Sequence, residues 1–394
     1  METRTIELAS VITDIAAGPF GSNLKVSCFV NEGFPIIDGA NLKGIKVTDN
    51  VTKFVTEDKA RSLHRSIASR GDVVVTISGN VGQISYIPSD SEYTEYLVSQ
   101  RQFRVTFDTK QVYVPYLVYY FHTYEGQHKI LSFANQTGVP ALAQPLKNFK
   151  KISMELPSLD EQKRIASVCE AITGKIETND KINDNLQHQA AALFANFYDR
   201  AETEVGFTEI IQILGGGTPK TGESSYWNGN IPFFTPKDVG SPYTLTSEKT
   251  ITEEGLAHCN SRLYPINTVF VTARGTVGKV GLPGVPMAMN QSCYALVGKD
   301  THQLLVYFYT LKAVDRLKHK ASGAVFDAIT TRDFESEIIM KLSDDDAKDF
   351  LDVAEPIYQV VLGNSIENLR LATLRDSLLP KLMSGEIDVS DIQL

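Results

Sequence analysis

Two stretches of this sequence carry an apolar side chain at every seventh position except the middle one, which is polar. In the first, residues 158–198, the repeat includes Ile172 and Asn179, and the same frame returns 185 residues later, the separation between Ile172 and Ile357. A seven-residue apolar repeat predicts long helices that pair along a shared stripe. The repeated positions are Ile165, Ile172, Asn179, Leu186, Leu193, Phe350, Ile357, Asn364, Leu371 and Leu378.

Each stripe has an asparagine at its middle position, Asn179 in the first and Asn364 in the second. A buried asparagine lowers stability but fixes the register, because its amide needs a polar group opposite. In an antiparallel pair related by a pseudo-twofold axis, Asn179 would face Asn364. We therefore predict an antiparallel coiled coil within one chain; the alternative is two amphipathic helices with accidental heptads. The second apolar row is expected at Val168, Ile182, Val353, Val360 and Leu374.

The ends of both helices also have sequence signals. Ser158 with Glu161 forms a capping box that predicts a helix start, and Ser343 with Asp346 repeats it. Pro356 is expected to kink or split the second helix, because proline lacks the N–H that the helix needs.

The remainder of the first half predicts a mixed α/β domain. A strand is expected at 72–77, a glycine-bracketed loop at 78–83, a second strand at 99–105 and a helix at 115–132. Residues 205–342 retrace this order, with an offset of about 185–197 residues. The matching segments are 231–238 with 34–41, 268–279 with 72–83, 290–292 with 99–101, 305–309 with 117–121, and Ser322-Gly323 with Thr137-Gly138.

The sequence thus predicts an α+β fold class with an internal repeat and a pseudo-twofold axis. Two globular α/β domains, residues 1–156 and 205–342, are joined and separated by two long helices that form an antiparallel coiled coil. The helical regions are residues 157–204 and 343–394.

The formal net charge of −9 is unevenly distributed. Residues 1–155 and 205–342 each carry a net charge of +1, whereas 156–204 carry −4 and 343–394 carry −7. The globular segments can therefore present a basic face to a polyanion. The acidic helices would be repelled by phosphates and are expected to meet protein partners or solvent.

Motifs for catalysis and metal binding are missing from the sequence. The segment around Gly278-Lys279 lacks the Ser or Thr of a phosphate loop, and no N/D-P-P-Y/F methyltransferase tetrapeptide or H-E-x-x-H motif occurs. The four cysteines form no C-x-x-C pair, which predicts a reducing compartment and no zinc site. Without a signal-peptide pattern or a long apolar run, we expect a cytoplasmic protein.

The loops of the two domains offer the chemistry of DNA recognition instead. Lys and Arg neutralise phosphates, and Arg, Asn and Gln make paired hydrogen bonds to base edges. Glycines beside them let the backbone approach a ligand closely. The candidate DNA-binding residues are Asn23, Lys25, Lys43, Asn80, Gln83 and Arg101 in the first domain, and Thr218, Lys220, Lys237, Arg274, Thr276 and Lys279 in the second.

Three segments resemble the specificity (S) subunit of type I restriction-modification systems. They are L-P-S-L-D-E-Q-K-R-I at 156–165, G-G-T-P-K with Y-W-N-G-N-I-P-F-F at 216–234, and the tail L-R-D-S-L-L-P-K-L-M-S-G-E-I at 374–387. The first half departs from this pattern, since it has Gly18-Pro19-Phe20-Gly21 in place of G-G-T-P-K.

The resemblance implies two target-recognition domains that each read half of a split, asymmetric sequence in double-stranded DNA. It implies no catalysis or cofactor in this chain. Modification subunits would carry S-adenosylmethionine, and restriction subunits would use ATP and Mg. The alternatives are a stand-alone restriction or methyltransferase enzyme and a coiled-coil protein with no DNA role. If the helices set the gap, inserting four residues near Asn179 should lengthen it without changing either half-sequence.

Overall fold

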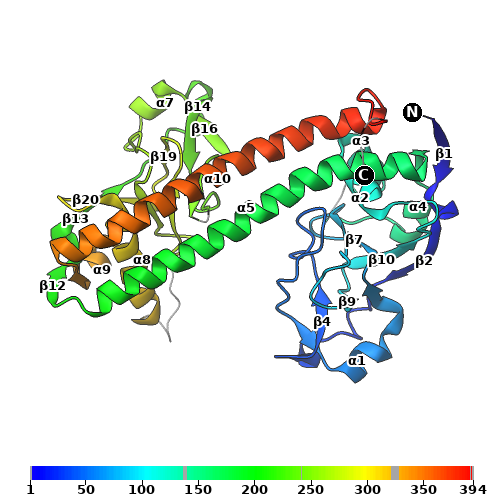
Figure 1. Ribbon diagram of the computed structural model, residues 1–394, viewed down its shortest axis with the longest axis horizontal. Coiled ribbons are helices and arrows are strands. Elements are labelled where there is room, and N and C mark those ends of the chain that lie inside the picture. Colours follow the sequence, from blue (N-terminus) through cyan, green and yellow to red (C-terminus); the bar gives the residue numbers. More distant parts are fainter. Residues whose placement is uncertain (1, 136–139, 241, 321–327, 391, 393–394) are drawn as a thin grey trace. The chain divides into compact units, whose positions relative to one another are not determined.

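The structure, a computed structural model, describes residues 2–135, 140–240, 242–320, 328–390 and 392 (Figure 1). Its contacts divide the chain into unit 1, Met1–Gly174 with Ala372–Leu394, and unit 2, Lys175–Leu371. Two long helices, α5 (Leu159–Asp199) and α10 (Asp344–Ser384), each contribute one end to each unit. None of the helices described is long and apolar enough to cross a membrane.

The two predicted long helices are confirmed, and so are their caps. The amide of Glu161 donates to Ser158 Oγ (3.3 Å) at the start of α5, and that of Asp346 donates to Ser343 Oγ (3.1 Å) at the start of α10. The expected split at Pro356 is wrong, since α10 is helical throughout. Pro356 lies on the exposed face, where water can satisfy the carbonyl that it leaves without an N–H donor.

Unit 1 holds three groups of paired strands. One sheet has the order β2-β10-β7-β8, a second has the order β3-β5-β4-β9-β6, and β1 pairs with β11. The strands are β1 Thr3–Glu7, β2 Ile12–Ala17, β3 Phe29–Val30, β4 Phe34–Ile37, β5 Phe54–Val55, β6 Ile67–Ser69, β7 Val73–Thr76, β8 Ile84–Tyr86, β9 Glu95–Val98, β10 Gln102–Phe107 and β11 Ser153–Pro157. The shorter helices are α1 Glu57–Ser62, α2 Val114–His122, α3 Tyr124–Leu131 and α4 Pro145–Lys150.

Unit 2 repeats this arrangement. Its larger sheet has the order β13-β20-β17-β18-β15, a second has the order β16-β14-β19, and β12 pairs with β21. The strands are β12 Thr203–Gly206, β13 Ile211–Gly215, β14 Trp227–Phe234, β15 Tyr243–Thr244, β16 Lys249–Ile251, β17 Val269–Thr272, β18 Val280–Pro283, β19 Ala288–Met289, β20 Cys293–Gly298 and β21 Ile338–Lys341. The shorter helices are α6 Phe207–Ile210, α7 Glu253–Ala257, α8 Gln303–Lys320 and α9 Thr331–Glu335.

The strand orders confirm the predicted internal repeat. The run β2-β10-β7-β8 of unit 1 corresponds to β13-β20-β17-β18 of unit 2. The parallel pair β4 with β9 likewise corresponds to the parallel pair β14 with β19. The expected match of Ser322-Gly323 with Thr137-Gly138 lies outside the described residues.

Two predicted elements of unit 1 differ from the structure. The strand expected at 99–105 begins only at Gln102, because residues 99–101 form a turn in which the Gln102 amide donates to the Ser99 carbonyl (3.1 Å). The single helix expected at 115–132 is two helices that break at Thr123. Thr123 accepts from the Gly126 amide (3.1 Å) and so caps a new helix.

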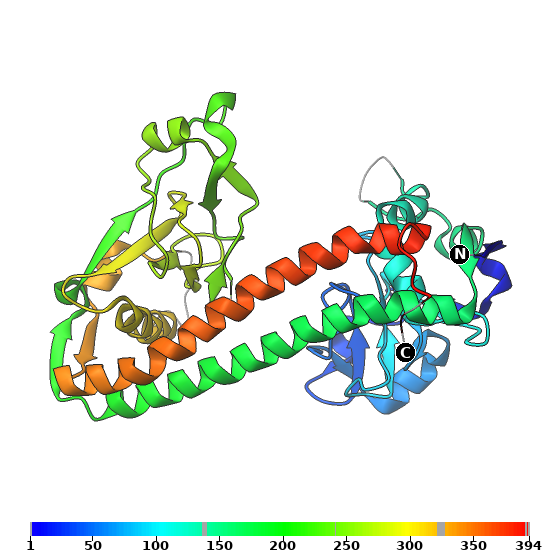
Figure 2. The same cartoon turned by 45° about the horizontal axis from the view of Figure 1, so that its top comes forward.

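In unit 2 the two long helices lie side by side and run antiparallel (Figures 1 and 2). The predicted meeting of Asn179 with Asn364 is wrong by one helical turn. Asn179 donates to Asn368 Oδ1 (2.8 Å), and Asn364 donates to Asn183 Oδ1 (2.8 Å). The 185-residue repeat maps Asn183 onto Asn368, so the two pairs are equivalent and the axis passes between them.

The second apolar row also lies elsewhere than predicted. Val353 and Val360 are each 49% exposed, whereas their neighbours Ala354 and Val361 are fully buried. The buried row therefore follows the first row by four residues rather than three. On α5 the same offset gives the buried side chains Cys169, Asn183 and Ala190.

The helix ends also complete the hydrophobic cores. In unit 1, Ile165 and Cys169 of α5 and Leu379 and Leu382 of α10 belong to the core that contains β7, β10 and α2. In unit 2, aromatic residues supply the corresponding packing. The Phe194 ring lies 4.9 Å from that of Phe308 in α8 and 5.4 Å from that of Phe350 in α10.

Candidate nucleic-acid interface

Four loops meet at one edge of the β2-β10-β7-β8 sheet in unit 1. They follow β2 (18–23), β4 (38–41) and β7 (77–83), and precede β10 (99–101). Backbone hydrogen bonds join them, from Gly18 N to the Gln102 carbonyl (2.8 Å), from Ile77 N to that of Arg101 (2.7 Å) and from Ser99 N to that of Ile37 (2.9 Å). The loop after β2 and the turn before β10 are therefore held on one common frame.

Most of the unit 1 candidates gather along two clefts beside these loops. Asn23 and Arg101 line a cleft of about 860 Å³. Asn80, Gln83 and Arg101 line a second cleft, of about 580 Å³. Arg101 thus lies on the wall between the two clefts and can reach a ligand in either.

The placement of three unit 1 candidates, Lys25, Lys43 and Gln83, differs from that of the others. Lys25 is exposed on the segment between Leu24 and Val26, which both line the second cleft. Lys43 is exposed but lines neither cleft, so the structure does not bring it together with the others. Gln83 is half-buried, and its Oε1 accepts from Thr76 Oγ1 (3.3 Å).

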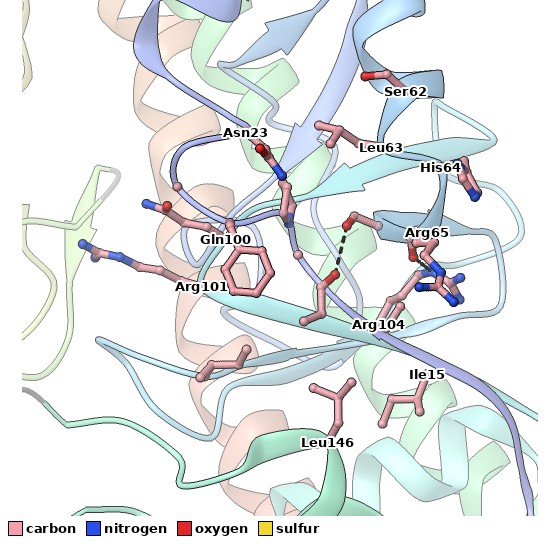
Figure 3. A pocket seen from close by; sticks show the side chains of 18 of the residues that line it. Ile15, Asn23, Ser62, Leu63, His64, Arg65, Gln100, Arg101, Arg104 and Leu146 are labelled. Atoms are coloured by element: carbon pink, nitrogen blue, oxygen red, sulfur yellow. Dashed lines mark hydrogen bonds between the residues drawn. The ribbon is translucent and has the colours of Figure 1, made fainter.

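A buried arginine sits at the base of the larger cleft. Arg104 donates to Asp14 Oδ2 (2.6 Å) and to the Arg65 carbonyl (3.0 Å). The hydrogen bond from Arg104, together with its charge, holds the pKa of Asp14 below its ordinary value, although partial burial acts in the opposite sense. Figure 3 shows Gln100 and Arg101 on one side of this cleft and Arg65 and Arg104 on the other.

Unit 2 brings together the equivalent four loops. They follow β13 (216–220), β14 (235–238) and β17 (273–279), and precede β20 (290–292). Backbone bonds again join them, from Gly217 N to the Met289 carbonyl (3.1 Å), from Ala273 N to that of Ser292 (2.8 Å) and from Asn290 N to that of Phe234 (3.0 Å).

Several unit 2 candidates lie on these loops and hold them together. Thr218 is hydrogen-bonded to Gln291, and Thr276 Oγ1 donates to the Pro236 carbonyl (3.1 Å). Lys237 lies 3.8 Å from Glu248 and is 81% exposed. Lys220 and Arg274 are exposed.

Lys279 is placed differently from the other unit 2 candidates. It lines a hollow of about 480 Å³ whose opposite wall includes Val314, Asp315 and Lys318 of α8. Lys279 therefore borders a hollow beside α8.

Sequence reasoning missed three residues that the geometry places at these edges. Gln100 lines both unit 1 clefts, and Gln291 occupies the matching turn of unit 2. The match between 99–101 and 290–292 was the signal for both residues. The third is Trp227, whose Nε1 donates to the Lys220 carbonyl (3.1 Å) and so anchors the Lys220 loop. Nothing in the sequence pattern indicated that bond.

The ten predicted pairing positions divide between the two units. In unit 1, Ile165 is buried, and Ile172 and Leu378 are half-buried. In unit 2, Asn179 and Phe350 are buried. The half-buried members there are Leu186, Leu193, Ile357, Asn364 and Leu371.

Among the described residues, no cluster of three or more His, Cys, Asp or Glu side chains could hold a metal ion. The four cysteines are unpaired, with Cys169 and Cys293 buried. The candidate side chains at the loop edges are Asn, Gln, Thr, Lys and Arg, which offer hydrogen bonding and charge neutralisation.

Comparison with known proteins identifies the family. A family model described as "Type I restriction modification DNA specificity domain" matches residues 26–188 and 203–341, which is most of the chain. The chain belongs to this specificity-domain family. The family resemblance inferred from the sequence is thereby confirmed, and the domain model matches once in each half of the repeat.

Named relatives match only part of this family member. The MjaIX specificity subunit of Methanocaldococcus jannaschii is 32% identical over 124 residues, which is 30% of this chain and 29% of the relative. The EcoR124I/EcoR124II specificity subunit of Escherichia coli is 35% identical over 106 residues, which is 26% of each chain. The matches thus span under a third of the length of these two relatives.

A solved structure supports the fold over the whole length. The type I restriction-modification S subunit from M. genitalium is 15% identical, and the alignment covers 97% of this chain and 96% of that one, with a TM-score of 0.54. At this identity the similarity concerns the fold alone. It agrees with the predicted architecture of two globular domains and two long helices.

Proposed function

We propose that this chain is the DNA-recognition subunit of a type I restriction-modification complex, and that each unit reads one half of a split, asymmetric site. The observation that carries the proposal is the repeated loop edge. In both units, loops that follow or precede equivalent strands present exposed amide or cationic side chains, among them Asn80, Gln100 and Arg101 in unit 1 and Lys220, Arg274 and Gln291 in unit 2. Such side chains can form hydrogen bonds with base edges and can also bind phosphates.

The side chains at the two loop edges differ in the contacts that they can make with DNA. Asn80, Gln100 and Arg101 in unit 1 can make paired hydrogen bonds with adenine or guanine edges. Lys220 and Arg274 in unit 2 supply positive charge, and each phosphate that they neutralise makes binding more sensitive to salt. The loops differ in sequence between the units, which supports recognition of two unlike half-sequences.

In this proposal the two acidic helices connect the two globular domains and supply the surface on which partner subunits dock. We infer that modification subunits, which hold S-adenosylmethionine, bind there and methylate adenine. Restriction subunits would join them and use ATP and Mg to cut unmodified DNA. In this proposal the chain itself is not catalytic, and its contribution is to place the partners on the correct sequence.

The helices would then also set the gap between the half-sequences. Because Asn179 bonds Asn368 and Asn183 bonds Asn364, an insertion in α5 alone would break both pairs. Inserting seven residues into both α5 and α10 beside these asparagines keeps the pairing rows and adds about 10 Å, or about three base pairs. We expect methylation mapping to show a longer gap and unchanged half-sequences. Changed half-sequences with an unchanged gap would contradict this role of the helices.

The decisive experiment is genome-wide mapping of methylated adenines. Cells with the chain and its modification subunits should show one split motif, which disappears when the chain is deleted. A catalytically inactive modification subunit is the control for motifs from other enzymes. A methylation pattern that persists without the chain would overturn the proposal, and so would methylation by the purified chain alone with S-adenosylmethionine.

A further inference from the structure

The loop after β2 exposes a phenylalanine at its tip. The side chain of Phe20 is 82% exposed, among the most exposed of the large apolar residues in the described chain. The loop turns there, with the Asn23 amide donating to the Phe20 carbonyl (2.8 Å). The ring is thus exposed on a turn that a backbone hydrogen bond holds in place.

The backbone just before Phe20 is tightly held. A Cβ on Gly18 would lie 1.9 Å from the Ser99 carbonyl oxygen. Because that atom belongs to the backbone, only glycine permits such close approach of the loop to the turn before β10. The loop that carries Phe20 is therefore ordered before a ligand binds, so binding requires little additional ordering of its backbone.

The neighbours of the ring are groups that bind nucleic acid. Phe20, Asn23, Gln100 and Arg101 line the same cleft. An apolar side chain flanked by amides and a guanidinium has the composition of a wedge that enters a base step while its neighbours bond the adjacent base edges and phosphates.

The corresponding loop of unit 2 has no such wedge. Its residues at this place are Thr218, Pro219 and Lys220; Pro219 is buried, and Thr218 is hydrogen-bonded to Gln291. The two halves of the molecule therefore differ in a feature that affects the shape of bound DNA as well as its sequence.

We propose that Phe20 inserts between adjacent base pairs of the half-site read by unit 1 and partly unstacks that step. The inference rests on the proposed function, and it adds a residue that reads DNA deformability. Pyrimidine–purine steps unstack most easily. Phe20 would therefore favour such a step at one position of the first half-site, without a hydrogen bond to either base pair.

The test uses the full chain assembled with its modification subunits and a duplex carrying the mapped site. The fluorescent analogues 2-aminopurine and pyrrolocytosine replace adenine and cytosine one position at a time, except at the methylated adenine. We expect fluorescence to rise on binding at one step of the first half-site and at none of the second. Phe20→Ala should abolish that rise and weaken binding about tenfold, whereas Phe20→Leu should keep part of both.

Tyr124→Ala is the matched control, because Tyr124 is also on unit 1 and is 88% exposed. It should change neither the fluorescence nor the affinity, and circular dichroism should match for all variants. Failure of the wild-type assembly to bind the mapped duplex would refute the proposed function. Normal binding without brightening in the first half-site, or brightening that survives Phe20→Ala, would refute the wedge alone.

Discussion

Single side chains at the loop edge of unit 1 link stability to pH. Asp14 accepts from Arg104, whose side chain is only 10% exposed, and that bond lowers the pKa of Asp14 below its ordinary value. A carboxyl group with a lowered folded-state pKa stabilises the fold above its unfolded-state pKa, and that contribution is lost as the pH falls toward the folded value.

Replacing Asp14 tests this linkage. Asp14→Asn should lower the free energy of unfolding at pH 7 by at most about 1 kcal/mol, because Asp14 is more than half exposed and solvent screens the pair. The difference from wild type should persist down to about pH 5 and shrink below about pH 4. Urea unfolding at a series of pH values measures it. A difference that grows on acidification would contradict the assignment.

At the same scale, the paired asparagines satisfy polar groups inside the helix interface. Asn183 accepts from Asn364 (2.8 Å) and donates to the Val361 carbonyl (3.4 Å). Asn183→Ala should therefore destabilise the chain by about 1–3 kcal/mol, because the Asn364 amide loses its acceptor.

Urea denaturation measures this loss, and Asn185→Ala on the exposed face of α5 is the control, with an expected change within about 0.5 kcal/mol. The double change Asn183→Leu with Asn364→Leu should recover much of the stability, since both polar partners are removed together. Equal effects of Asn183→Ala and Asn185→Ala would show that the interfacial bonds contribute nothing.

At the scale of elements, the two long helices were predictable but their second contact row was not. The heptad frame and the caps defined α5 and α10 closely. On α10, however, Val353 and Ala354, and Val360 and Val361, are adjacent apolar residues, so its sequence alone permits offsets of either three or four. The α5 sequence does not decide either, because the offset of three has Val168 and Ile182 but also Lys175 and Gln189, whereas the offset of four has Ile176 and Ala190 but also Asn183.

Adjacent valines of α10 offer a direct test of the row. Val361 is fully buried against the core of unit 2, whereas Val360 is 49% exposed. Val361→Asp should cost about 3 kcal/mol or more, because it buries a charge without a partner. Val360→Asp should stay within about 0.5 kcal/mol. Thermal or urea unfolding measures the loss of stability in each variant. A larger loss for Val360→Asp than for Val361→Asp would support the offset of three.

The candidate interface was predictable in outline only. The repeat of glycine loops located both edges, and Asn23, Asn80 and Arg101 do line the clefts of unit 1. Sequence could not show that Lys43 lines neither cleft or that Lys279 borders the hollow beside α8, because the surroundings of an exposed lysine depend on which loops pack beside it. The bond from Trp227 to Lys220 joins a strand to a neighbouring loop, and no spacing rule predicts such a contact.

At the scale of the whole molecule, unit 1 is built from two segments that are distant in sequence, whereas unit 2 is one continuous segment. Unit 1 combines Met1–Gly174 with Ala372–Leu394, and its core includes the buried side chains of Leu379, Leu382 and Val389. The heptads indicated that α10 pairs with α5, but they gave no sign that its end completes the first globular core.

Removing residues 372–394 should therefore damage unit 1 and spare unit 2. Hydrogen exchange measured by mass spectrometry should show lost protection in β2, β7 and β10 and unchanged protection in β17 and β20, because local stability follows the buried contacts that remain. Leu382→Asp should reproduce the effect, and Lys381→Asp at the neighbouring exposed position should not. Equal loss of protection in both units would contradict the division.

Because unit 1 is discontinuous in sequence, its folding depends on the order in which the ribosome makes its two segments. The ribosome completes every residue of unit 2 before it makes residues 372–394, on which unit 1 depends. Of the two units, unit 1 is the first to enter synthesis and the last able to finish folding, and part of its apolar core stays uncovered while residues 175–371 are added. A nascent chain arrested before residue 372 should accordingly engage holdase chaperones through unit 1, although that unit lies farthest from the exit tunnel.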